Sequence, residues 1–166
     1  IPKGEWLLQS AAGSSLGRMV IRLGKQSGIR TINVVRRPES VGDLKSLGAD
    51  EVICAEGDAI TDRVLSITKG QGVGFAIDPV GGETGTAVIA SLAAGGRALL
   101  FGLLSGQTVS VDPRSLLDGS KRVEGFLLSD WAQQQSVFTL LHLFRRVWKL
   151  IREGVLSTDR IVSHPL

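Results

Sequence analysis

The chain has 166 residues, of which 43% are hydrophobic and 21% charged, and its formal net charge at pH 7 is +3. This is the composition of one globular domain rather than of a disordered chain. The net charge is too small to argue for nucleic acid, and because basic residues are spread out and aromatic residues are few, no nucleic-acid partner is expected. No hydrophobic run approaches the roughly 20 residues that span a bilayer, so no membrane partner is expected, and the only cysteine, Cys54, excludes an intrachain disulfide and a cysteine-based zinc site.

Six short apolar runs, separated by helical patterns, are predicted to be β-strands. They are almost continuously apolar, as expected when helices cover both faces of a parallel sheet. Repeated β–α units with short connections predict a doubly wound α/β fold of the Rossmann type, with strand order 3-2-1-4-5-6 and a ligand crevice at the carboxyl ends of strands 1 and 4. The strands are expected over residues 6–11, 31–35, 51–55, 73–80, 97–104 and 123–129.

Between these runs, apolar residues recur at helical spacing. Pro38 is expected to open a short second helix that ends near Gly48. The glycines of ETGTAVIASLAAGG are expected to close a helix over residues 83–96, and a long amphipathic helix is expected over residues 137–151. The first helix is predicted from Leu16, Met19, Val20 and Leu23.

The AAGSSLG turn before that first helix matches neither G-x-G-x-x-G nor the P-loop pattern. If Gly17 is the third glycine of the dinucleotide fingerprint, the first falls on Ala12 and the second on Ser14. Both substitutes are small, so the backbone could still approach a pyrophosphate, and Ser14 and Ser15 add hydroxyl groups at a helix N-terminus. The alternative is a turn that only packs a helix on the sheet. The strand–turn–helix context favours a dinucleotide.

Arg36 and Arg37 follow the second strand, where an NAD site usually carries Asp or Glu about 20 residues after the turn. A guanidinium group cannot accept a hydrogen bond from the ribose 2′-hydroxyl, but it can hold a 2′-phosphate through charge-assisted bonds. The alternative is a pair of solvated arginines in a loop. The position of the pair favours NADP(H) as the cofactor.

Five segments together resemble the cofactor domain of medium-chain dehydrogenases/reductases: LLQSAAGSSLGRMVIRLGKQSGIRTINVVRRP, LKSLGADEVI, IDPVGG, LLFGLLSGQ and VEGFLLSDW. They are most similar to the zinc-independent branch of 2-enoyl thioester reductases and quinone oxidoreductases. The resemblance implies an NADPH-dependent oxidoreductase that reduces an activated C=C bond, such as that of an enoyl thioester, by hydride transfer. Alternatives are a quinone oxidoreductase-like or alcohol dehydrogenase-type enzyme, and a module that senses NADPH without catalysis.

The resemblance also assigns roles in cofactor binding. It implies that the glycine turn holds the pyrophosphate and that the two arginines read the 2′-phosphate. The loop after the fifth strand would lie along the nicotinamide half, and the backbone of the sixth strand would meet the carboxamide. The residues implied are Gly13, Ser14, Ser15, Leu16 and Gly17 in the turn; Arg36 and Arg37; Val80 after the fourth strand; Phe101, Gly102, Leu103 and Leu104 in the loop; and Phe126, Leu127 and Leu128.

No catalytic residue and no metal ligand is expected within the chain. The proton donor of the resembling reductases is a tyrosine from another domain, and this chain contains no tyrosine. Cys54 is interpreted as a small core residue, and His142 and His164 stand too far apart for a zinc site. Asp78 is interpreted as a turn-forming residue before a proline, with contact to a ribose as the alternative.

Both ends of the chain are interpreted as cuts, because it begins without Met and stops at IVSHPL just after a new apolar pair. We therefore expect residues 1–166 to be one NAD(P)-binding domain excised from a longer protein whose catalytic domain precedes it. The single cysteine fits a reducing compartment, the cytoplasm or alternatively the mitochondrial matrix. In the resembling family the sixth strand pairs with its twin, which implies a homodimer through the strand expected to begin at Val123 and end at Ser129.

Overall fold

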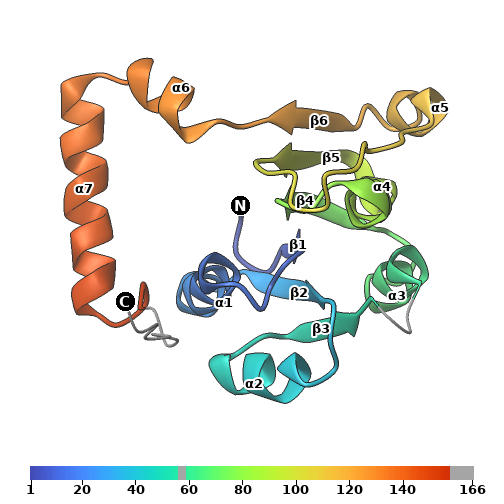
Figure 1. The fold of residues 1–166 in the computed structure, drawn as a ribbon, viewed down its shortest axis with the longest axis horizontal. Coiled ribbons are helices and arrows are strands. Elements are labelled where there is room, and N and C mark those ends of the chain that lie inside the picture. The colour runs from blue at the N-terminus through green and yellow to red at the C-terminus, as the bar shows by residue number, and fades with distance from the viewer. Residues whose placement is uncertain (56–58, 158–166) are drawn as a thin grey trace, which may run out of the picture.

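The computed structural model describes residues 1–55 and 59–157. Within them, a six-stranded sheet has the order β3-β2-β1-β4-β5-β6, as predicted, and its neighbouring strands are parallel (Figure 1). The strands are β1 (Trp6–Gln9), β2 (Arg30–Val35), β3 (Glu51–Cys54), β4 (Val73–Asp78), β5 (Leu92–Leu100) and β6 (Arg122–Gly125).

Helices connect the strands and cover the sheet. Because the strand order reverses between β1 and β4, α1 and α2 pack together on one face and α3 and α4 pack together on the other. The helices are α1 (Ser15–Ser27), α2 (Ser40–Leu47), α3 (Ile60–Ile67), α4 (Gly82–Ala90), α5 (Pro113–Leu117), α6 (Leu128–Gln133) and α7 (Val137–Arg152). No helix of the described residues has the length and apolarity needed to cross a membrane.

The helix α1 packs on the sheet through small residues. Gly17, Ile21 and Gly24 are buried, and a Cβ atom on Gly17 would lie only 2.6 Å from the Cα atom of Ala12. Ala12 lies in the turn after β1, so Gly17 allows α1 to approach this turn closely. The apolar stripe from which the helix was predicted lies to one side of this contact, and its first residue, Leu16, is 51% exposed.

The prediction of a helix up to residue 96 is wrong. The helix α4 ends at residue 90, and Leu92 already pairs with Val73 in β5. The backbone then bulges: Gly95 has φ +71°, and a Cβ atom on Gly96 would lie less than 3 Å from two backbone oxygens. The glycines that suggested a helix end therefore accommodate an irregular strand.

The fifth and sixth strands end earlier than predicted. β5 stops at Leu100, so the next four residues form a loop. β6 covers Arg122–Gly125 instead of residues 123–129. The backbone N–H of Phe126 still donates to the carbonyl oxygen of Leu100 at 2.8 Å, but Leu127 lies in a loop and Leu128 begins α6. These leucines have no neighbouring strand to pair with because the chain turns away from the sheet.

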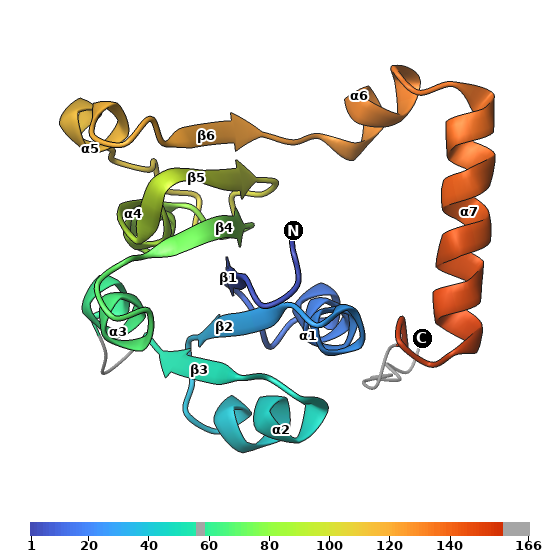
Figure 2. The same cartoon turned by 180° about the vertical axis from the view of Figure 1, so that it is seen from behind.

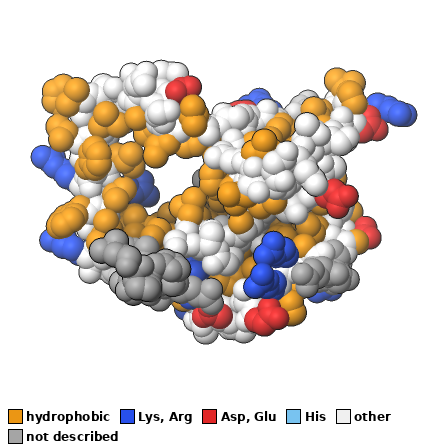
Figure 3. Space-filling model, viewed as in Figure 1, with side chains coloured by type: hydrophobic (Ala, Val, Ile, Leu, Met, Phe, Trp, Pro, Cys, Tyr) orange, Lys and Arg blue, Asp and Glu red, His pale blue; other side chains and the backbone are white. Residues whose placement is uncertain are grey.

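The last helix, α7, is amphipathic as predicted but stands apart from the sheet (Figures 1 and 2). None of its residues is buried, and the side chains of Val137, Phe144 and Trp148 are 63–69% exposed. The space-filling view shows hydrophobic side chains along this helix and an open hollow between it and the rest of the molecule (Figure 3). The apolar face of α7 is thus left without a packing partner among the described residues.

Candidate functional site

The switch point of the sheet is held together by Asp78, at the end of β4. Its buried carboxylate accepts hydrogen bonds from the hydroxyl of Ser10, just beyond β1, and from the backbone N–H groups of Val80 at 3.1 Å and Gly81 at 2.8 Å. The interpretation of Asp78 as a turn-forming residue is therefore confirmed. The carboxylate also connects the end of β1 to the turn after β4. It therefore holds in place the two segments that border the crevice at this point.

The glycine turn leads directly from β1 into α1. Ser14 is the N-cap residue of the helix, and its Oγ atom accepts a hydrogen bond from the backbone N–H of Gly17 at 3.1 Å. The first turn of α1 contains no acidic residue, so its positive end is not neutralised from within. Next to Ser14, Gly13 leaves open space: a Cβ atom there would meet a single atom within 4 Å, the Oγ of Ser40 at 3.7 Å.

A cavity of about 560 Å³ lies over this turn. It is bounded by the turn, by the residues that follow β2, and by the loops that follow β4 and β5. This is the crevice at the carboxyl ends of the strands where ligands of such sheets bind. The expected cofactor residues that line it are Gly13, Ser14, Arg36, Arg37, Val80 and Leu104.

Arg36 and Arg37 bring positive charge to the wall of this cavity. Both side chains are exposed, and among the described residues neither guanidinium has an ion-pair or hydrogen-bond partner. Two unpaired cations beside the N-terminus of α1 make the cavity favourable for a ligand that carries several negative charges. The chemistry of these donors fits a dinucleotide with an additional phosphate.

The opposite wall is a pair of loops joined by backbone hydrogen bonds. The N–H of Leu104 donates to the carbonyl oxygen of Pro79 at 2.9 Å, and the N–H of Ser105 donates to that of Val80 at 2.9 Å. Gly102 is needed for this close approach, because a Cβ atom there would lie 2.8 Å from the oxygen of Pro79. The loop expected to follow the nicotinamide half is therefore fixed to the turn after β4, although only its last residue, Leu104, lines the cavity.

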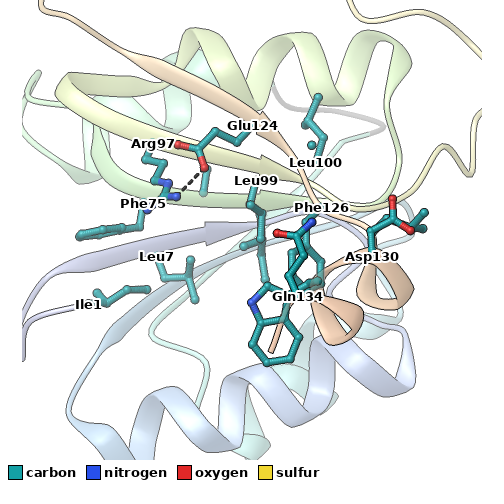
Figure 4. A pocket seen from close by; sticks show the side chains of 15 residues that line it. Ile1, Leu7, Phe75, Arg97, Leu99, Leu100, Glu124, Phe126, Asp130 and Gln134 are labelled. Atoms are coloured by element: carbon teal, nitrogen blue, oxygen red, sulfur yellow. Dashed lines mark hydrogen bonds and ion pairs between the residues drawn. The ribbon is translucent and has the colours of Figure 1, made fainter. Parts of the chain in front are cut away.

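Other expected cofactor residues lie elsewhere. Ser15 and Leu16 belong to the exposed side of α1. Phe126 and Leu127 line a second cavity of about 870 Å³, between one face of the sheet and α6 (Figure 4). Leu128 lines neither the first cavity nor the second. An ion pair between Arg97 and Glu124 spans this second cavity's wall, and the adjacent carboxylate raises the pKa of the guanidinium by hydrogen bonding and by its charge.

About half of the residues that line the first cavity were not predicted from the sequence. Several of these residues lie at the carboxyl ends of β1, β2 and β3. They could have been predicted, because ligands of such sheets bind at the carboxyl ends of the strands. Ser40 could not be found in this way, because α2 was expected to begin at Pro38 and in fact begins at Ser40. The residues missed are Ala11, Val34, Val35, Ser40, Ala55, Thr84 and Ser105.

Cys54 is not the core residue expected. It is partly exposed at the end of β3, with its Sγ atom 3.4 Å from the carbonyl oxygen of Arg36. His142 lies exposed on α7, and His164 lies outside the described residues. Across residues 1–55 and 59–157 no group of three His, Cys, Asp or Glu side chains could hold a metal ion.

Residues 15–146 match the model of a protein family described as zinc-binding dehydrogenase. The chain is 32% identical over 167 residues to the human mitochondrial enoyl-acyl-carrier-protein reductase, which covers 98% of this chain and 45% of that protein. The solved quinone oxidoreductase of Pseudomonas syringae superposes with a TM-score of 0.85 at 28% identity, over 96% of this chain and 49% of its own. The solved quinone oxidoreductase of Escherichia coli, complexed with NADPH, superposes with a TM-score of 0.86 at 25% identity, over 97% of this chain and 49% of its own. The chain thus spans less than half of each relative.

Proposed function

The chain belongs to the zinc-binding dehydrogenase family of the medium-chain dehydrogenase/reductase superfamily, and from this premise we propose that it is the NADPH-binding domain of an oxidoreductase that reduces an activated C=C bond. The observation that carries the choice of cofactor is the pair Arg36 and Arg37, exposed and without partners among the described residues, on the wall of the crevice. An acidic residue there would instead accept hydrogen bonds from the ribose of NAD.

The residues of the crevice divide the binding of NADPH between them. Gly13 and Ser14 leave the N-terminus of α1 open to the pyrophosphate, and the two arginines face the adenosine 2′-phosphate. Leu104, 74% exposed, supplies an apolar surface toward the nicotinamide half. When bound, NADPH supplies the hydride; this chain binds and orients the cofactor and shields it from water.

We propose that the proton donor and the substrate pocket belong to a second domain of a longer protein. The chain has no tyrosine and spans about half of its relatives. The second cavity has Leu7, Phe75 and Leu99 on the sheet face, beside the Arg97–Glu124 ion pair. The apolar face of α7 is exposed as well (Figures 3 and 4). Apolar surface of this extent on one side of a domain is typical of a site that another domain covers.

The two kinds of relative suggest two different classes of substrate. Similarity to the mitochondrial enoyl reductases supports an enoyl thioester and the mitochondrial matrix. Similarity to bacterial quinone oxidoreductases supports a quinone. We propose the enoyl thioester, because the human enoyl reductase has the higher sequence identity of these relatives. Assays of the full-length protein with a 2-enoyl-CoA and with a soluble quinone separate the two.

We also propose a homodimer formed through the free edge of β6. Among the described residues, this strand pairs with β5 on one side and has no neighbouring strand on the other. With four residues, Arg122–Gly125, it offers a shorter edge than the sequence suggested, and a two-fold axis through it would extend the sheet across both copies.

Isothermal titration of the chain with NADPH and with NADH tests the cofactor assignment. We expect NADPH to bind at least about tenfold more tightly, because charge-assisted hydrogen bonds to the extra phosphate contribute about 1.5–3 kcal/mol each. Equal affinity for the two cofactors, or a preference for NADH, would overturn the assignment. Binding to neither would overturn the proposed function as a whole.

A further inference from the structure

Ser40 is the contribution of α2 to the wall of the crevice. It begins the helix, and its backbone N–H donates to the carbonyl oxygen of Arg37 at 3.4 Å, so it lies one turn beyond the arginine pair. Its side chain is half-buried, and the hydroxyl has no hydrogen-bond partner among the described residues. By contrast, the hydroxyl of Ser46 on the same helix donates to the carbonyl oxygen of Asp43 at 2.7 Å.

Gly13 faces Ser40 across the mouth of the cavity. The Ser40 Oγ atom lies 3.7 Å from where a Cβ atom on Gly13 would stand, and no other atom comes within 4 Å of that position. A longer side chain at position 13 would fill the space above the hydroxyl. Ser40 is therefore accessible from the cavity because residue 13 has no side chain.

The charges around Ser40 favour an anion. Arg36 and Arg37 line the same cavity, whereas neither Asp43 in α2 nor Glu39 just before it does so. Asp43 forms an ion pair with Arg18 at 2.6 Å, and Glu39 is exposed and does not line the cavity. A hydroxyl in the first turn of a helix, flanked by two unpaired cations, is a suitable third donor to one phosphate group.

On the basis of the proposed function, we propose that the Ser40 hydroxyl donates a hydrogen bond to the adenosine 2′-phosphate of NADPH, and that the absence of a side chain at Gly13 leaves this hydroxyl accessible. Together with Arg36 and Arg37, Ser40 then determines the preference for the phosphorylated cofactor. The role is one of recognition and involves no covalent step.

The test compares 2′,5′-ADP with 5′-AMP, which differ only in the 2′-phosphate, in titrations of the chain. We expect Ser40→Ala to weaken binding of 2′,5′-ADP and NADPH about tenfold and to leave 5′-AMP and NADH within about twofold. The control is Ser46→Ala, which removes a hydroxyl from the same helix outside the cavity and should change neither affinity. Melting temperatures of both variants show whether the fold is retained.

A double-mutant cycle then asks whether Ser40 and Arg37 act on the same phosphate. We expect the combined loss for 2′,5′-ADP in Ser40→Ala with Arg37→Ala to be smaller than the product of the separate losses, since both donors share one acceptor group. Equal losses for 2′,5′-ADP and 5′-AMP, no loss for either, or strictly independent effects would overturn the role of Ser40 while NADPH binding by the parent chain stands. A parent chain that binds no 2′,5′-ADP would overturn this role together with the cofactor assignment.

Discussion

The hydroxyl of Ser10 donates a hydrogen bond to the buried carboxylate of Asp78, residues that stand at the ends of β1 and β4. The contact closes the point at which the strand order reverses, and the crevice opens directly beside it. A buried carboxylate is tolerated there because a hydroxyl and two backbone N–H groups satisfy it. The geometry of the glycine turn therefore depends on a polar contact beside it.

We expect loss of this contact to destabilise the domain. Asp78→Ala leaves the Ser10 hydroxyl and two backbone N–H groups buried without partners, which should lower the free energy of unfolding by about 3 kcal/mol or more. Ser10→Ala removes one donor and should cost about 1–3 kcal/mol. Urea unfolding checks both, with the exposed Ser46→Ala expected within about 0.5 kcal/mol of the parent. If Asp78→Ala is no less stable than this control, the structural role is wrong.

Gly17 and Gly42, both within helices, should respond in opposite directions to alanine. A Cβ atom on Gly17 would lie 2.6 Å from backbone atoms of Ala12, so Gly17→Ala should push α1 away from the turn after β1 and lower the free energy of unfolding by about 2 kcal/mol. Gly42 in α2 has no atom within 4 Å of its Cβ position, so Gly42→Ala should raise it by about 0.5–1 kcal/mol. Thermal melts distinguish the two, and a stabilised Gly17→Ala would contradict the packing described.

Replacing Arg36 and Arg37 together by alanine should weaken NADPH binding about 100-fold while changing NADH binding less than about threefold. The reason is the loss of charge-assisted hydrogen bonds to a group that NADH lacks. Raising the ionic strength should weaken NADPH binding by the parent more than by the double variant. Arg114 lies in α5 and its side chain is 88% exposed, so Arg114→Ala is the matched control and should change the affinity for neither cofactor. Parallel losses for both cofactors would refute the assignment.

Val123→Pro should separate dimer formation from folding. The N–H of Phe126 points to β5, and successive peptide groups of a strand alternate in direction, so the N–H of Val123 points to the free edge. Proline there removes no hydrogen bond to β5, but it blocks a second copy from pairing. Light scattering should therefore show monomers for Val123→Pro and dimers for the parent.

Glu124→Pro provides the comparison, because that N–H points inward and its loss should disturb β6 itself. A monomeric parent chain, or a dimer that persists in Val123→Pro with unchanged circular dichroism, would contradict dimerisation through this edge.

Substitutions on the apolar face of α7 should leave the isolated chain intact. Phe144 and Trp148 are 68% and 63% exposed, so replacing both with serine should change the melting temperature little and should reduce binding of the dye ANS. In the full-length protein the same two serine substitutions should lower the melting temperature by several degrees if a second domain covers the helix. Ile21→Ala is the control for a buried residue and should destabilise either form by about 2–5 kcal/mol. An equal effect of the serine pair in both proteins would argue against the covering domain.

The alternation of strands and helices, the parallel sheet and its order could be predicted because each depends on short-range patterns. Apolar runs between turn residues determine the strands, and connections of helical length determine parallel pairing. The two arginines could also be placed, because the distance in sequence from the glycine turn to the end of β2 is nearly constant in such folds. Binding of NADPH by these residues stays a prediction.

The sequence by itself determined the fold class and the edge of the sheet at which the crevice lies. Only the tertiary structure decided where β5 bulges, where β6 ends, that Asp78 bonds to Ser10, and that Ser40 faces Gly13. These features depend on contacts between residues far apart in the chain, whose separation no local pattern encodes. A helix end and a strand bulge both use glycine for its backbone freedom, and packing against a neighbouring strand decides between them.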